Sequence, residues 1–212
     1  MKLDKKSLLL YAVTDRTWLN GRNLADDVEK TLQGGATFVQ LREKDASFEE
    51  FVEQAKEVKA VCKKYGVPFV INDNIEVALA VDADGVHVGQ SDMEAGSVRE
   101  KIGSDKIIGV STRTVEEALL AKERGADYLG VGAMFNTSTK LDASEVSFAE
   151  LKEICGTVGL PVVAIGGISL NNVEELQGTG IDGVAVVSAL FAAKDIKNAS
   201  KEMKLKLDKV VN

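Results

Sequence analysis

Short hydrophobic runs alternate along the whole chain with longer stretches whose apolar residues recur at helical spacing. The short runs contain few polar residues, which is typical of parallel strands that are covered on both faces. Polar residues such as Ser47, followed three positions later by Glu50, form capping boxes that mark the starts of helices. The predicted strands are residues 8–13, 36–41, 69–71, 85–88, 106–110, 128–131, 161–165 and 183–187.

About eight strand–helix units favour a closed barrel. The helices are predicted to begin near residues 23, 47, 74, 91, 114, 147, 171 and 196. Glycines such as Gly34, Gly125 and Gly180 recur where a helix leads into a strand, because glycine suits a left-handed helix end. Since nothing resembles a linker, we expect one α/β domain over residues 1–212, a single (β/α)8 TIM barrel. A doubly wound open sheet is the alternative.

Composition and charge narrow the range of partners. The net charge is -7, from 26 basic and 33 acidic residues, which argues against nucleic acid or an anionic membrane as the main partner. The apolar run at 8–13 is too short to span a bilayer. Cys62 and Cys155 fall in amphipathic helical patterns without metal-binding spacing, which indicates reduced thiols and a cytoplasmic protein. The sequence leaves a homo-oligomer open.

Polar residues collect after the predicted strands, where a barrel of this type carries its active site. The segment Gln-Leu-Arg-Glu-Lys ends the second strand. Strand alternation would turn Gln40, Arg42 and Lys44 to one side, and Leu41 and Glu43 to the other. Two cations and an amide donor at one strand end predict a receptor for a multiply charged anion. A solvated strand end balanced by acidic neighbours is the simpler alternative.

Two carboxylates follow the next two strands, beside this cation pair. Asp73 comes after the third strand and Asp92 after the fourth. Each has a plainer interpretation, Asp73 as a helix cap before Asn74 and Asp92 as a first-turn residue that favours the helix dipole. Together with the cations they favour Mg²⁺, which binds through one or two carboxylates plus substrate phosphates.

A second anion site is predicted at the ends of strands seven and eight. Gly166 and Gly167 follow strand seven and Ser188 follows strand eight, which are the usual phosphate positions of these barrels. Gly167 would let backbone N–H groups approach a phosphate, and Ser188 would open a short helix. A tight turn is the plainer interpretation of the glycine pair. Thr137, Thr139 and Lys140 add donors from the loop after strand six.

The single histidine, His87, lies inside the fourth predicted strand, so we expect it to fill a layer of the barrel and not to act as a base. Neither cysteine follows a strand. The chemistry therefore favours a reaction that needs little acid–base help, in which a diphosphate departs and a nucleophile with its own lone pair takes its place.

In combination and order, these motifs resemble the thiamine-phosphate synthase family. The resemblance extends from residue 10 to residue 189 and is carried by residues 40–44, 72–73, 89–92, 109–111, 137–140, 165–168 and 187–189. It implies a (β/α)8 barrel that uses Mg²⁺ and two phosphorylated small-molecule substrates. Such an enzyme joins an aminopyrimidine methyl diphosphate to hydroxyethylthiazole phosphate and releases pyrophosphate.

The resemblance also implies residue roles. The pyrimidine diphosphate would be bound by Gln40, Leu41, Arg42, Glu43, Lys44, Asn72, Ser111 and Lys140. Of these, the residues closest to the chemistry would be Arg42, Lys44, Ser111 and Lys140. The thiazole phosphate would be bound by Thr137, Ser138, Thr139, Gly167, Val187 and Ser188, and Mg²⁺ by Asp73 and Asp92.

One departure from the family pattern is visible after strand six. The family loop commonly contains prolines where this chain has Ala133 and Asn136, so the rigidity of this loop is in question. Two other functions stay open on the sequence: a related barrel that only isomerises the thiazole phosphate, and a barrel that senses phosphate without catalysis.

Overall fold

Eight parallel strands close into a barrel in the computed structural model, which describes residues 3–90, 98–136 and 145–211. Each strand pairs with its neighbours in sequence, and β1 also pairs with β8, with Leu10 opposite Val184. The strands are β1 (Leu10–Val13), β2 (Phe38–Leu41), β3 (Phe69–Asn72), β4 (Gly85–Val88), β5 (Ile107–Thr112), β6 (Tyr128–Val131), β7 (Val162–Ile165) and β8 (Gly183–Val186). The predicted barrel is confirmed, and the open-sheet alternative is wrong.

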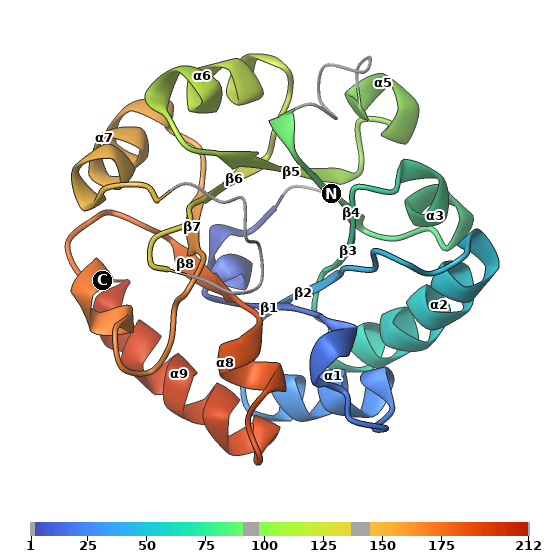
Figure 1. The fold of residues 1–212 in the computed structure, drawn as a ribbon. Helices are drawn as coiled ribbons and strands as arrows, with labels where there is room; N and C mark the ends of the chain where they lie inside the picture. Colours follow the sequence, from blue (N-terminus) through green and yellow to red (C-terminus); the bar gives the residue numbers. More distant parts are fainter. Residues whose placement is uncertain (1–2, 91–97, 137–144, 212) are drawn as a thin grey trace.

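Helices surround the strand ring (Figure 1). They are α1 (Leu24–Gln33), α2 (Phe48–Tyr65), α3 (Ile75–Ala80), α5 (Val98–Ile102), α6 (Val115–Glu123), α7 (Phe148–Val158), α8 (Ser188–Phe191) and α9 (Ile196–Val210). Short 3-10 helices are η1 (Lys5–Leu8), η2 (Arg16–Trp18) and η3 (Val173–Leu176). In the described part of the chain, none of the helices has the length and apolar character that crossing a membrane requires.

Two predicted elements differ from the structure. The helix predicted from residue 171 is only the 3-10 turn η3. Leu8, predicted to begin the first strand, instead ends η1 and is fully buried against the side chains inside the barrel. Leu8 therefore packs at the N-terminal end of the barrel interior. A buried strand residue would be equally hydrophobic, so the sequence pattern could not distinguish the two positions.

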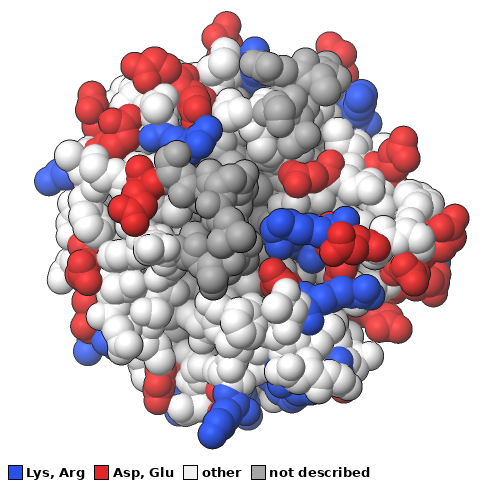
Figure 2. Space-filling view, in the orientation of Figure 1, with Lys and Arg blue, Asp and Glu red and all other residues white. Residues whose placement is uncertain are grey.

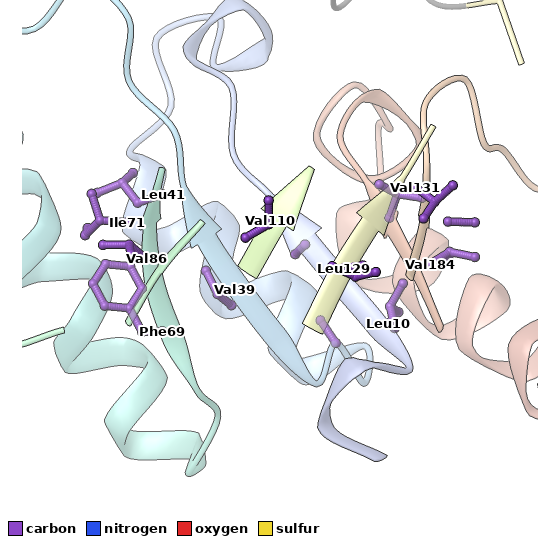
Figure 3. Packing of buried hydrophobic residues seen from close by; sticks show 14 of the residues in the cluster. Leu10, Val39, Leu41, Phe69, Ile71, Val86, Val110, Leu129, Val131 and Val184 are labelled. Atoms are coloured by element: carbon purple, nitrogen blue, oxygen red, sulfur yellow. The ribbon is translucent and has the colours of Figure 1, made fainter. Parts of the chain in front are cut away.

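The alternating side chains of the strands build two separate layers of core. One face of each strand packs against the helices, and Figure 3 shows Leu41, Phe69, Ile71 and Val86 lying together in this outer layer. The other face fills the barrel interior. The interior cluster comprises Leu8, Tyr11, Val13, Phe38, Val70, Ile107, Tyr128, Val163 and Ala185. This division leaves the residues at the strand ends available for a site.

Capping residues begin the helices as predicted. Ser47 accepts the backbone N–H of Glu50, and the Glu50 carboxylate accepts the N–H of Ser47, so the capping box is complete. Ser147 likewise accepts the N–H of Glu150, but the Glu150 carboxylate crosses to the N–H of Val115 at 3.0 Å and ties α7 to the start of α6. The capping box predicted at residue 91 lies outside the described residues.

A repeated two-way hydrogen bond joins the strands in pairs at their N-terminal ends. In each case the first partner is the residue just before an even-numbered strand, and the second partner lies at the start of the preceding strand. The first partner donates its backbone N–H to the carbonyl of the second. The side-chain oxygen of the first partner accepts the backbone N–H of the second. The pairs are Thr37 with Leu10, Asp84 with Phe69, Asp127 with Ile108 and Asp182 with Val162. The side-chain bonds measure 2.8–3.0 Å. Polar residues at this rim thus serve the fold.

Candidate active site

A pocket of about 740 Å³ opens at the C-terminal ends of the strands. Its lining includes most of the predicted site residues that the structure describes: Gln40, Arg42, Glu43, Lys44, Asn72, Asp73, Ser111, Gly167, Val187 and Ser188. Leu41 belongs instead to the outer core between the strands and the helices. Asp92, Thr137, Ser138, Thr139 and Lys140 lie outside the described residues.

Charged side chains gather on one side of this face. Figure 2, in the orientation of Figure 1, shows basic and acidic side chains side by side over the region of β2 and β3. The positive charge is therefore confined to a small region of a molecule whose net charge is -7. This arrangement suits an anionic ligand that is held by specific contacts and not by the overall field.

Arg42 is held in place from the end of β1. Its Nη1 forms an ion pair with Asp15 Oδ2 at 3.2 Å, and its backbone N–H donates to Thr14 Oγ1 at 3.0 Å. Asp15 is itself fixed because its other carboxylate oxygen accepts the N–H of Thr17 at the start of η2. Among the described residues only one of the five guanidinium N–H donors of Arg42 has a partner, so the others can serve a ligand.

Glu43 does not follow the predicted alternation. Because β2 ends at Leu41, the next residues are free of the strand geometry, and the Glu43 side chain lines the pocket with only 3% of its surface exposed. Burial raises the pKa of the Glu43 carboxyl, against the opposing effect of Arg16, whose Nε lies 3.1 Å from Oε2. Its Oε1 has no hydrogen-bond partner within the described chain. Lys44 is exposed at the pocket edge.

Asp73 occupies a strained backbone position at the end of β3. Its φ is 58°, which is left-handed and uncommon for a residue other than glycine. Its Oδ2 accepts Asn72 Nδ2 at 2.6 Å, and its backbone N–H donates to the carbonyl of His87. The cap of α3 is Asn74, whose side chain accepts the N–H of Val77, so the interpretation of Asp73 as a helix cap is wrong.

An exposed Asp73 carboxylate beside cations suits a hard cation that also binds phosphate oxygens. No group of three or more His, Cys, Asp or Glu side chains that could enclose a metal occurs in residues 3–90, 98–136 and 145–211. A single carboxylate beside cations fits an ion that takes its other ligands from phosphate oxygens and water, as Mg²⁺ does. The second predicted ligand, Asp92, is outside the described residues.

Polar side chains also form the floor of the pocket. His87 is 6% exposed, lines the pocket, and lies with Nε2 3.0 Å from Ser111 Oγ. The expectation that this histidine only fills a layer was therefore incomplete. Gln40 points inward, on the side opposite to Leu41 as predicted, and its Nε2 donates to the Tyr11 hydroxyl at 2.6 Å. Gln90 Nε2 donates to the Ser111 carbonyl at 2.8 Å and steadies this strand end.

The glycine pair after β7 has a structural reason of its own. Gly166 and Gly167 have φ of 96° and 66°, so both occupy the left-handed region. A Cβ on Gly167 would lie 2.5–2.6 Å from the carbonyl oxygens of Asn136 and Phe135. The N–H of Phe135 donates to the Gly166 carbonyl at 3.0 Å. The bend itself therefore requires glycine at both positions, and this part of the proline-free loop is anchored against β7.

Ser188 is an exposed pocket residue at the start of α8, as predicted, and Val187 precedes it at the helix N-cap. The pocket therefore has two separate groups of polar residues. One lies after β2 and β3 and carries the cations and Asp73, and the other lies after β7 and β8 and offers backbone groups and a hydroxyl.

The two cysteines lie away from this pocket. Both are free thiols, as predicted, and burial raises the pKa of Cys62 to about 12 and that of Cys155 to about 11. Such thiols are poor nucleophiles at neutral pH. The pocket chemistry therefore rests on oxygen and nitrogen groups.

Comparison with known proteins identifies relatives of the whole chain. A family model described as thiamine monophosphate synthase matches residues 10–190. The thiamine-phosphate synthase of Clostridium tetani is 52% identical over 194 residues, which cover 92% of this chain and 93% of that protein. The Clostridioides difficile thiamine-phosphate synthase is 51% identical, with 96% and 97% covered.

A solved structure agrees with these sequence relatives. The thiamine phosphate pyrophosphorylase from Pyrococcus furiosus superposes with a TM-score of 0.89 at 40% identity, covering 98% of this chain and 99% of that one. A geranylgeranylglyceryl phosphate synthase from Thermoplasma acidophilum, at 13% identity and a TM-score of 0.72, shares the fold alone. The chain belongs to the thiamine-phosphate synthase family of transferase enzymes.

Proposed function

We propose that the pocket joins an aminopyrimidine methyl diphosphate to hydroxyethylthiazole phosphate, giving thiamine phosphate and pyrophosphate. The observation that supports this assignment is that one pocket carries two separate groups of polar residues, each suited to an anion. Arg42, Lys44 and Asp73 follow β2 and β3, whereas Gly167 and Ser188 follow β7 and β8, with β1 between the two strand pairs. A diphosphate suits the first position and a monophosphate suits the second.

Arg42 and Lys44, with Lys140, would stabilise the negative charge that grows on the departing pyrophosphate. Asp73 and Asp92 would hold Mg²⁺, which supplies further positive charge to the leaving group as a Lewis acid. The ion pair with Asp15 sets the guanidinium of Arg42 before the ligand arrives, so little rearrangement is needed. The aminopyrimidine can delocalise the positive charge left on its methylene carbon, which favours a dissociative step.

The second substrate would then attack through the lone pair of its thiazole nitrogen. Holding both phosphates aligns the two partners, and this proximity can supply about 7–11 kcal/mol at best. No protein base is required in this scheme. Both ring nitrogens of His87 already have hydrogen-bond partners, Tyr128 and Ser111, which disfavours the alternative in which the barrel isomerises a thiazole phosphate through a histidine base.

Calorimetric titration of each substrate tests the assignment of the two positions. Arg42→Ala should weaken binding of the pyrimidine diphosphate with Mg²⁺ and spare the thiazole phosphate. Ser188→Ala should do the reverse, by about 1–3 kcal/mol for a hydrogen bond to a charged group. If each variant lost the other ligand, the two positions would have been assigned the wrong way round. A protein that binds one phosphate ligand and no second one would support the sensing alternative.

A further inference from the structure

A continuous chain of hydrogen bonds crosses the barrel interior beneath the pocket. Gln40 Nε2 donates to the Tyr11 hydroxyl at 2.6 Å, and the Tyr11 and Tyr128 hydroxyls lie 2.8 Å apart. The Tyr128 hydroxyl lies 3.0 Å from His87 Nδ1, and His87 Nε2 lies 3.0 Å from Ser111 Oγ. Five side chains from β2, β1, β6, β4 and β5 are thereby linked, and both ends of the chain line the pocket.

Two glycines of the barrel strands leave space for these hydrogen-bonded side chains. A Cβ on Gly109 would overlap the Tyr128 ring and hydroxyl, and a Cβ on Gly130 would lie 3.1 Å from His87 Cε1. Tyr11 and Tyr128 are at most 1% exposed, with Phe38 packed edge-on against both. Burial raises the pKa of both tyrosines far above the usual range, so each remains a neutral hydroxyl with one proton to donate.

The amide end of the chain gives it a direction. Because Gln40 donates to Tyr11, the Tyr11 hydroxyl directs its own proton to the only other hydroxyl that it contacts in the described chain, that of Tyr128. Tyr128 then donates to His87 Nδ1, which must be the unprotonated ring nitrogen. In that tautomer the proton is on Nε2, which would donate to Ser111 Oγ, 3.0 Å away. The reverse direction would give Tyr11 two incoming bonds and leave its proton without an acceptor.

We propose that every hydrogen bond in this series is donated in the direction from Gln40 to Ser111. This direction fixes His87 as the Nε2–H tautomer and leaves the Ser111 hydroxyl as a donor to the bound substrate. Tyr128 and Tyr11 are then positioning residues that act through His87. Ser111 is the partly exposed end of the chain, and within the described residues its hydroxyl proton has no acceptor. It suits an acceptor atom of the pyrimidine diphosphate, a part of the inference that rests on the proposed function.

The tautomer can be read directly, because His87 is the only histidine in the chain. Two-bond ¹H–¹⁵N correlation spectra of the full-length, ligand-free protein at about pH 8, above the usual histidine pKa, distinguish the two ring nitrogens. We expect the wild type to show Nε2 protonated and Nδ1 bare. This measurement needs no variant and no activity. A wild-type spectrum with Nδ1 protonated would overturn the proposed direction.

Tyr128→Phe removes the donor to Nδ1 and should shift the His87 population toward the Nδ1–H tautomer. Tyr65→Phe is a matched control, because it removes the remaining tyrosine hydroxyl, which is bonded to Glu29 on the outside of the barrel. The control should leave the imidazole spectrum unchanged. If Tyr128→Phe also left it unchanged while the protein stayed folded, the tyrosine would not act through His87 and the inference would fail.

Turnover separates this inference from the proposed function. Tyr128→Phe should lower kcat/KM for the pyrimidine diphosphate by about threefold to tenfold, the effect of one net hydrogen bond, whereas Tyr65→Phe should not. A wild type with the expected tautomer but without product formation would contradict the proposed function and leave the proposed direction of the hydrogen bonds standing. A fall in turnover without a change of tautomer would reduce Tyr128 to a packing residue and overturn its positioning role.

Discussion

At the residue scale, Arg42 and Glu43 after β2 are placed by ion pairs with Asp15 and Arg16 and not by strand alternation. The sequence correctly predicted that Gln40 and Leu41 point to opposite sides, because both lie within the strand. It predicted Glu43 wrongly, because the strand ends before that residue and Arg16 draws the carboxylate. Such partners come from another strand end, so the local pattern of the sequence does not contain them.

The guanidinium of Arg42 offers the first test at this scale. Arg42→Lys keeps the charge but loses the planar fork that suits a diphosphate, so it should cost about 1–3 kcal/mol of transition-state stabilisation. Steady-state kcat/KM measures this loss. Arg124→Lys is the control, because Arg124 ends α6 and does not line the pocket. Equal activity of both variants would mean that Arg42 is only a solvated strand end.

Glu43 predicts a pH dependence of stability. Burial raises the pKa of Glu43 in the folded protein above its value in the unfolded protein. The folded protein therefore loses stability as pH rises between these two pKa values, because Glu43 ionises more readily in the unfolded chain. Glu43→Gln cannot ionise. The unfolding free energy of Glu43→Gln, relative to wild type, should therefore increase as pH rises from the usual glutamate range to the raised pKa. Urea unfolding at a series of pH values measures this difference.

Glu50 supplies a control of opposite sign. Its bonds with Ser47 lower the pKa of the Glu50 carboxyl, so wild type gains stability as that group ionises. The unfolding free energy of Glu50→Gln, relative to wild type, should fall as pH rises through that lower range. Slopes of the same sign in both variants would contradict the buried environment assigned to Glu43.

At the element scale, the sequence located the helix-to-strand turns but not their full role. The recurring glycines pointed to left-handed helix ends, and Gly125, just after α6, has the positive φ that this requires. The prediction is wrong for Gly34, which ends α1 with a right-handed φ of -83°, while the next residue, Gly35, has the positive φ. The aspartates beside the recurring glycines were not singled out. Asp84, Asp127 and Asp182 bond to the strand that precedes in the sequence, and only the closed sheet brings these groups together.

We expect substitution of these aspartates to lower the stability of the protein without lowering its catalytic activity. Asp84→Ala leaves the buried N–H of Phe69 without its acceptor and should cost about 1–3 kcal/mol of unfolding free energy. Asp208→Ala, which removes an exposed ion pair with Lys204 on α9, should change stability by less than about 1 kcal/mol. Denaturant midpoints and kcat/KM should be measured together. Lost turnover in a stable Asp84→Ala protein would place this residue in the site instead.

At the scale of the whole molecule, the barrel was predictable because eight buried strands alternate with helices in a regular order. The position of the site followed, since the polar residues collect after the strands on one rim. The interior hydrogen-bond chain was not predictable. Its Tyr11–Tyr128 contact joins residues 117 positions apart, and nothing in either local sequence distinguishes these tyrosines from ordinary core residues.

The central claim is that one pocket uses two phosphorylated substrates and a divalent cation to release pyrophosphate. The most direct measurement is pyrophosphate release and thiamine phosphate formation by the full chain, with each substrate alone and with both together. We expect both products in equal amounts only when both substrates and Mg²⁺ are present, with loss on EDTA treatment and recovery on adding Mg²⁺. Full activity under EDTA, or no thiamine phosphate from both substrates with Mg²⁺, would contradict the account.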